Sequence, residues 1–175
     1  MLILDQSGQV PDKPLGLVTR LGKVIDNIQS WQLTTLDWNP ISAEAIRSHP
    51  NARRLSEACP VYNCHGLTFA SRRTAVTQEL QPILDDDGYS EIREGEAREG
   101  DLAVYYEDGE VTHTGFVIGR EKLIGSVTSV RVWSKWNRGP EMSHLLQECP
   151  YFRGEDNIKF YRMTEWRESW RNIAP

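Results

Sequence analysis

The spacing of hydrophobic positions differs between the two halves of the chain. Over residues 64–81 apolar side chains recur at every third or fourth position, which predicts one long and mostly buried helix. In the second half, runs rich in Val, Leu, Ile and Tyr predict β-strands at 101–106, 111–118, 123–133 (interrupted near Gly125) and 158–162. Helices followed by an antiparallel meander predict an α+β fold.

Turn and cap signals divide the chain further. Asp108-Gly109 predicts a tight hairpin, 119–121 predicts a second turn, and Gly88 has the position of a helix-ending glycine. Residues 42–48 and 51–58 are expected to be helical. We expect a single domain over 1–175, with an N-terminal arm and helices over 1–50, the long-helix region over 51–90 and the antiparallel sheet over 100–162.

Composition and charge narrow the classes of function. The chain has 175 residues, a net charge of −5 and 39% hydrophobic residues, which predicts a globular protein without a broad basic face for nucleic acid. It contains no apolar run long enough for a membrane helix. The N-terminus has no basic segment typical of a secretory signal. We therefore expect cytoplasmic synthesis, with export by a specialised secretion system left open.

A thiol and an imidazole are the candidate reactive groups. The chain has three cysteines. An odd number argues against a disulfide framework and leaves at least one thiol free. Cys64 lies at the predicted start of the long helix, where Asn63 is placed to cap it and backbone N–H groups face the sulfur and a developing oxyanion. His113, in a predicted strand, shares one strand face with Gly115 and Val117 and is the candidate general base.

Three segments in this order resemble a known family. Tyr62-Asn63-Cys64-His65-Gly66 resembles the Tyr-Asp-Cys-Ser-Gly signature of NlpC-type and CHAP-type cell-wall amidases. Gly100–Tyr106 resembles their Gly-Asp-Leu strand, and His113–Gly119 resembles their His-Val-Gly-Ile-Tyr-Leu-Gly strand. The resemblance covers about 60–135 and implies a papain-like fold. It also implies that the Cys64 thiolate attacks an amide carbonyl, with His113 as base, to form an acyl-enzyme.

The resemblance also suggests supporting residues. It gives Tyr62 a role in holding the oxyanion or the substrate, beside Asn63. The third residue, which orients the base, falls at Gly125 or Ser126 by strict spacing, whereas an insertion in that strand favours Ser134. The segment around Ser134 also resembles a Ser-Lys-Trp-Gly segment of uncharacterised bacterial relatives. Further side chains expected near the site are His65, Trp133, Trp136 and His144.

The favoured function is hydrolysis of a peptide linkage in peptidoglycan, by an amidase or endopeptidase that needs no cofactor and no metal. Such an enzyme fits an effector, for which an immunity or inhibitor protein is an expected partner. One alternative is a protein-modifying cysteine enzyme, such as a deamidase or a peptidase. A catalytically degenerate binding module of the same fold is another. The last is a zinc module that uses Cys59, Cys64, His65 and Cys149.

Overall fold

An antiparallel sheet forms the centre of the molecule in the computed structural model, which describes residues 14–29, 46–123, 127–137 and 139–163. Within this part of the chain the sheet has seven strands in the order β2-β8-β7-β6-β5-β9-β4, and every neighbouring pair is antiparallel. In that order the strands are Arg53–Arg54, Glu141–Leu145, Thr128–Lys135, Glu110–Lys122, Leu102–Glu107, Ile158–Met163 and Tyr89–Ile92. The α+β class predicted from the sequence is therefore correct at this level.

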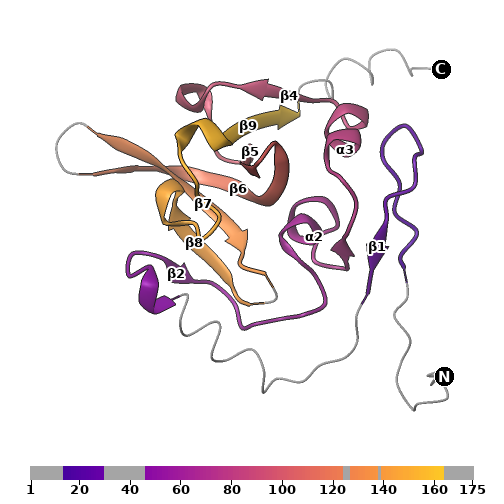
Figure 1. The fold of residues 1–175 in the computed structure, drawn as a ribbon, viewed down its shortest axis with the longest axis horizontal. Helices are drawn as coiled ribbons and strands as arrows, with labels where there is room; N and C mark the ends of the chain where they lie inside the picture. The colour runs from indigo at the N-terminus through magenta and orange to yellow at the C-terminus, as the bar shows by residue number, and fades with distance from the viewer. Residues whose placement is uncertain (1–13, 30–45, 124–126, 138, 164–175) are drawn as a thin grey trace, which may run out of the picture.

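Two short helices cover one face of the sheet. Helix α2 (Cys64–Phe69) packs against β6 and β7, and Leu84 of helix α3 (Gln81–Asp86) packs with Leu102 and Val104 of β5. In Figure 1 both helices lie between the sheet and β1 (Asn27–Ile28). Strand β1 pairs with β3 (Ala75–Val76), and this small sheet buries a second cluster around Ile25, Val76 and Ile83.

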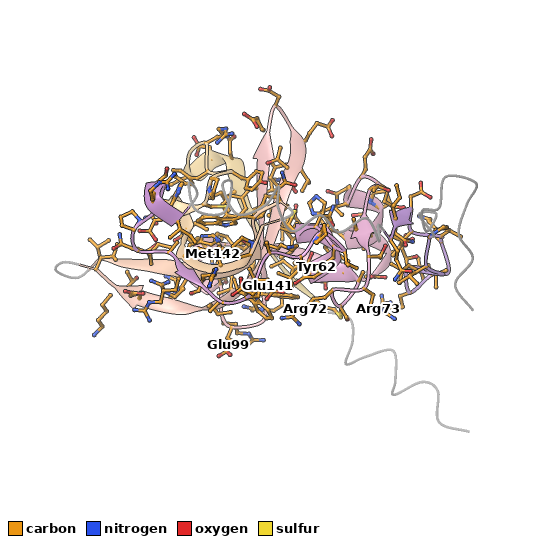
Figure 2. The ribbon with its side chains drawn as sticks, turned by 90° about the horizontal axis from the view of Figure 1, so that it is seen from below. Tyr62, Arg72, Arg73, Glu99, Glu141 and Met142 are labelled. Carbon is orange, nitrogen blue, oxygen red and sulfur yellow. The ribbon has the colours of Figure 1, made fainter. Side chains whose placement is uncertain are left out.

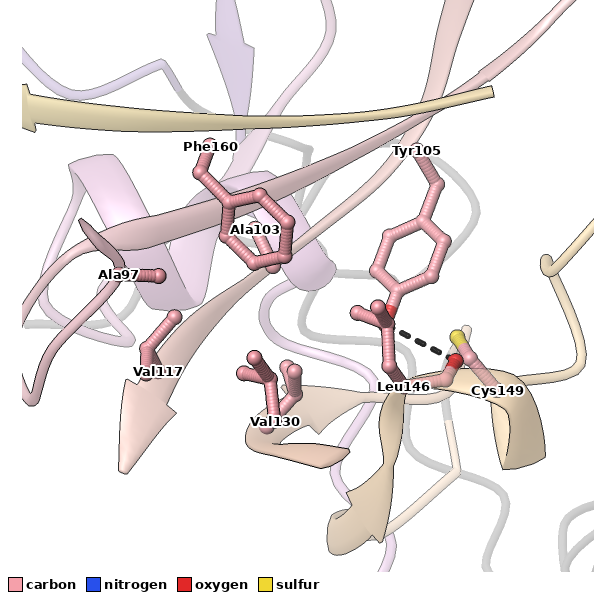
Figure 3. Packing of buried hydrophobic residues seen from close by; sticks show 9 residues of the cluster. Ala97, Ala103, Tyr105, Val117, Val130, Leu146, Cys149 and Phe160 are labelled. Carbon is pink, nitrogen blue, oxygen red and sulfur yellow. Dashed lines mark hydrogen bonds between the residues drawn. The ribbon is translucent and has the colours of Figure 1, made fainter. Parts of the chain in front are cut away.

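The opposite face of the sheet has its own core. Alternate side chains of β5, β6 and β7 point there, among them Tyr105, Val117 and Val132. The chain after β8 covers them, beginning with the 3-10 helix Leu146–Glu148, and the Tyr105 hydroxyl donates to the Leu146 carbonyl across this interface (Figure 3). Two further 3-10 turns, Glu94–Glu96 and Glu155–Asn157, connect strands on the periphery. The sheet thus separates two buried layers, and alternation decides which layer each side chain enters.

Several strand predictions are correct, but the long helix is not. Strands β5, β6 and β9 lie where the alternation placed them, and the predicted Asp108-Gly109 turn joins β5 to β6. Helix α2 ends at Phe69 because the chain reverses through Ser71 and Arg72, which both have positive φ. Gly88 has the predicted positive φ just after α3.

Two other predictions are wrong in the sheet region, and two strands were missed. Residues 51–58 contain β2 rather than a helix, because Arg53 and Arg54 pair with β8. Strand β6 runs through the predicted turn at 119–121 to Lys122, accommodated by a bulge. Strands β4 and β8 were not predicted at all. Of the predicted helix at 42–48, residues 46–48 are helical and the rest lie outside the described residues.

Candidate functional site

Cys64 opens α2, as predicted, and Asn63 is its cap. The Asn63 Oδ1 accepts hydrogen bonds from the backbone N–H of Gly66 at 2.8 Å and of Val76 at 3.1 Å, while Nδ2 donates to the Val76 carbonyl at 2.7 Å. The side chain therefore fixes the start of the helix and ties it to β3. Because both ends of this amide bond to the backbone, its role in the structure is to position Cys64 rather than to bind an oxyanion.

The start of α2 contacts β6 through Thr114. The Thr114 hydroxyl lies 3.0 Å from both His65 Nδ1 and the Thr68 hydroxyl. Nδ1 of His65 in turn lies 3.6 Å from the Cys64 sulfur. Burial raises the pKa of the Cys64 thiol to about 11 despite the opposing hydrogen bonds, and its side chain is only 6% exposed. At neutral pH the group is a protonated thiol.

His113 lies next to Thr114 but belongs to the other face of the sheet. It pairs with Tyr105 across β5 and β6, and its ring stacks on Tyr151 with centroids 4.1 Å apart and planes within 5°. The ring is fully buried, and neither of its nitrogens has a hydrogen-bond partner among the described residues. Burial, with the proximity of His144 and His65, holds the pKa of His113 well below its usual value, so the imidazole is neutral. His113 therefore does not form the predicted nucleophile–base pair with Cys64 in this structure.

Ser134 does not orient His113. Its Oγ lies 2.8 Å from Nε2 of His144, whose Nδ1 is 2.9 Å from the Leu145 carbonyl. Nδ1 must then donate, so Nε2 accepts the Ser134 proton. Burial lowers the pKa of His144 to about 4. Contrary to prediction, Ser134 and His144 form a separate buried pair on the His113 side of the sheet.

Tyr62 joins a network around Glu141 on the α2 side. Its hydroxyl donates to Glu141 Oε1 at 2.5 Å, Arg72 Nε donates to the same oxygen at 2.6 Å, and Trp133 Nε1 donates to Oε2 at 2.8 Å. Figure 2 shows Tyr62, Arg72 and Glu141 close together. The Tyr62 hydroxyl is thus engaged by a carboxylate. Sequence reasoning missed Glu141 because no local pattern distinguishes it from the many surface acids.

Lys135, the last residue of β7, and Trp136, which follows it, lie on opposite sides of the sheet. Lys135 is fully buried beside Tyr62, with its Nζ 4.5 Å from the centre of that ring. Trp136 contacts the rings of His49 and His144 at 5.2 and 5.4 Å, and its Nε1 has no hydrogen-bond partner among the described residues. Neither residue lines the cavity that Asn63 and His65 border.

A cavity of about 630 Å³ lies beside the start of α2. The two sequence neighbours of Cys64, Asn63 and His65, line it, whereas Cys64 itself does not, and burial lowers the pKa of His65 to about 4. The rest of the wall comes from the segment between β3 and α3 and from the β5–β6 hairpin, with Gln78, Glu110 and Val111 among its residues. The cavity is large enough for an extended segment of a peptide.

The proposed zinc ligands do not form a site. The described cysteine, histidine and acidic residues include no group of three or more placed to hold a metal ion. Cys149 packs with Tyr105 on the face of the sheet opposite α2. The three cysteines are free thiols, with Cys59 partly exposed and the other two buried.

Comparison of the chain with family models, curated proteins and solved structures found no match. Among the described residues, no helix is both long enough and apolar enough to cross a membrane. The functional argument therefore depends on the geometry around Cys64.

Proposed function

We propose that this protein is a cysteine-dependent hydrolase of amide bonds, with Cys64 as nucleophile and His65 as general base. One observation carries the proposal: Nδ1 of His65 lies 3.6 Å from the Cys64 sulfur, and His65 also lines the cavity beside α2. Burial keeps the pKa of His65 low, so its imidazole is neutral at pH 7 and able to accept a proton. His113, the base expected from the sequence, lies on the other face of the sheet and is not part of the proposed site.

The chemistry follows from these two side chains. The thiol proton passes to His65 Nδ1 as the sulfur attacks the amide carbonyl carbon, and the C–N bond breaks as the protonated imidazole returns that proton to the leaving amine. Water then hydrolyses the thioester with His65 as base. Catalytic hydrogen bonds are often long in unliganded enzymes, so the 3.6 Å separation of His65 Nδ1 from the sulfur is expected to shorten when substrate binds.

The cavity beside α2 provides the place for a substrate. His65 and Asn63 line it, and polar side chains from the segment between β3 and α3 and from the β5–β6 hairpin surround it. An extended peptide fits its volume and its mixed lining. A peptide linkage of peptidoglycan is the substrate that the resemblance to NlpC-type and CHAP-type amidases favours, and the papain-like fold is part of the same proposal.

The test is digestion of purified peptidoglycan, with release of amines and of soluble fragments as readouts. Wild type is expected to digest it, and Cys64→Ala and His65→Ala are each expected to lose at least about 10³-fold in rate, because each removes a group that forms or breaks bonds. Ser134→Ala is the matched control in the β6–β7 region. It is expected to stay within about tenfold of wild type, because Ser134 contacts His144 on the face of the sheet opposite α2.

His113→Ala separates the roles of the two imidazoles. If His65 is the base, this variant keeps most of the activity, whereas a deep loss in His113→Ala together with an active His65→Ala would move the base to His113. A Cys64→Ala protein that digests at the wild-type rate would end the proposal.

A further inference from the structure

Two threonine hydroxyls connect the proposed base to the backbone of its own helix. The Thr114 hydroxyl lies 3.0 Å from His65 Nδ1 and 3.0 Å from the Thr68 hydroxyl. Thr68 Oγ1 in turn lies 3.2 Å from the backbone carbonyl oxygens of Cys64 and of His65. Thr114 is fully buried in β6, and Thr68 is partly buried in α2. We call this series of contacts the hydroxyl relay.

The number of protons in the hydroxyl relay determines its direction. A hydroxyl group carries one proton, whereas a backbone carbonyl oxygen only accepts. The contacts of Thr68 with the two carbonyls therefore use the Thr68 proton. Its contact with Thr114 then uses the Thr114 proton, which leaves a lone pair of the Thr114 oxygen to face His65. All of these contacts are hydrogen bonds at once only when His65 Nδ1 carries a proton.

A neutral ring with a lone pair at Nδ1 requires the opposite direction. The Thr114 proton then points to Nδ1 and the Thr68 proton to the Thr114 oxygen, so the contacts of Thr68 with the carbonyls lose their proton. The relay reverses when Nδ1 gains a proton, and this takes only the rotation of two hydroxyl groups. Each threonine keeps its own proton, so the proton that arrives from the sulfur is the only one transferred.

The reversal favours the protonated ring. A hydrogen bond from a charged donor is about twice as strong as one between neutral groups. The bond from Nδ1–H of the imidazolium to Thr114 is therefore stronger than the bond from Thr114 to the neutral ring. Burial acts in the opposite direction and lowers the pKa of His65 to about 4. A buried imidazolium without this acceptor is less stable still.

The titratable groups around His65 do not replace Thr114 in this role. The Cys64 thiol is neutral at pH 7 because burial raises its pKa to about 11, and His113 of β6 is neutral because burial depresses its pKa. The cavity wall that includes His65 also carries Glu79, Tyr106 and Glu110. Among the described residues, the hydrogen-bond partners of the ring are the Cys64 sulfur and Thr114.

We propose that Thr114 is a positioning residue whose hydroxyl accepts a hydrogen bond from His65 Nδ1 once that nitrogen has taken the thiol proton. Thr68 supports it by accepting the Thr114 proton in turn. The relay holds Nδ1 toward the sulfur and stabilises the imidazolium while the thioester forms. The catalytic significance rests on the proposed function, whereas the effect on protonation of His65 exists without any substrate.

The experiment follows protonation of His65 by nuclear magnetic resonance of protein labelled in the histidine rings, with the His65→Ala spectrum to identify the signal. Thr114→Val keeps the shape of the side chain and removes the hydroxyl, and Thr114→Ser keeps the hydroxyl. At a pH near 5 we expect Thr114→Val to lower the ratio of protonated to neutral His65 about fivefold, because the charged ring loses its acceptor. Thr114→Ser is expected to stay within about twofold of wild type.

Thr112→Val is the matched control, because Thr112 lies on the same strand and its hydroxyl donates to the Tyr105 carbonyl at 3.3 Å. Its His65 titration is expected to coincide with that of wild type. A Thr114→Val titration that coincides with wild type overturns the proposal, as does a folded Thr114→Ser protein that loses as much protonated ring as Thr114→Val. If the spectrum of Thr114→Val shows an unfolded protein, Thr114→Ala replaces it and an unchanged titration there has the same meaning.

Digestion of peptidoglycan gives the second readout. Thr114→Val is expected to lower the rate about tenfold and Thr114→Ser to keep it within about threefold of wild type, because only the first removes the acceptor of the Nδ1 proton.

The two proposals fail separately. A shifted His65 titration with no digestion of peptidoglycan by wild type contradicts the hydrolase and leaves the role of Thr114 intact. Digestion that depends on Cys64 and His65, with an unshifted titration in Thr114→Val, supports the hydrolase and overturns the role of Thr114.

Discussion

At the scale of single residues, buried histidines determine how the stability of this protein responds to acid. His113 and His144 are both fully buried on the same side of the sheet, one without hydrogen-bond partners and the other between Ser134 and Leu145. Burial favours the neutral form of each ring because a charged imidazole loses its hydration. The folded protein therefore resists protonation at two sites that an unfolded chain protonates near pH 6.5.

Acid is expected to destabilise the fold through these two histidines and through His65. The folded-state pKa values lie below the ordinary 6.5, about 4 for His144 and His65 and well below 6.5 for His113. Between pH 6.5 and 4 the unfolded chain binds more protons, so the free energy of unfolding decreases as pH falls, by about 1.4 kcal/mol per pH unit for each histidine. Urea unfolding at pH 7 and pH 5 measures this. His144→Gln should remove about one proton from the slope, and a flat profile would contradict the prediction.

Gly115 is required by the close approach of β6 and β7. A Cβ at this position would lie 2.6 Å from Val132 Cγ1 and 2.8 Å from both Ser134 Cβ and the Trp133 carbonyl oxygen. We expect Gly115→Ala to lower the free energy of unfolding by about 1–3 kcal/mol, because two strands must shift to admit the methyl group. Urea denaturation measures the loss. Gly95→Ala, which meets no atom within 4 Å, is the control and should change stability by less than about 0.5 kcal/mol.

At the scale of elements, α2 depends on contacts from outside itself. A six-residue helix has little intrinsic stability, and its Gly66 packs directly against the Thr74 carbonyl of the returning chain. The Asn63 side chain adds two hydrogen bonds from the start of α2 to the backbone of Val76 in β3. The contacts of α2 with β3 therefore determine the position of Cys64 more than the intrinsic stability of the helix does.

Asn63→Ala is expected to destabilise the protein by about 2 kcal/mol, because the helix loses its cap and Val76 loses two hydrogen bonds. Asn63→Asp keeps the acceptor and loses the donor, so its loss should be smaller. Thermal unfolding of the three proteins gives the order. Equal stability of wild type and Asn63→Ala would show that the cap is dispensable.

At the scale of the whole molecule, Glu141 connects segments that are distant in sequence. Its side chain accepts from Tyr62, Arg72 and Trp133, and its backbone bonds to Ser56 and Leu55. Hydrogen bonds from Arg72 and Tyr62 hold its pKa below the ordinary value although burial, the largest single influence, acts the other way. The network therefore holds the segment that precedes Cys64 against strands β7 and β8.

Glu141→Ala is expected to lower the free energy of unfolding by about 1–3 kcal/mol, because it leaves the buried Tyr62 hydroxyl and the partly exposed Arg72 and Trp133 without their acceptor. Glu148→Ala, at a partly exposed carboxylate later in the same segment, is the comparison and should cost less. Chemical denaturation of both variants measures the difference. Similar values for the two would indicate that the network contributes little.

The sequence by itself determined the α+β class, the main hairpin, the cap at Asn63 and the start of a helix at Cys64. Each of these depends on a local pattern: strand alternation in β5, β6 and β9, an Asp-Gly turn, and an Asn side chain that accepts from a nearby backbone N–H. Local signals of this kind act over a few residues, so they are visible without coordinates.

Only the tertiary structure decided what surrounds the thiol. Helix α2 stops at Phe69 because the chain must return to pair with β1, and a periodic pattern does not record that partner. Ser134 serves His144, and Lys135 rather than Ser134 faces the Cys64 side, because the register of β7 against β6 and β8 sets the face of each residue. A shift of one position reverses every face, and register arises from contacts between distant segments.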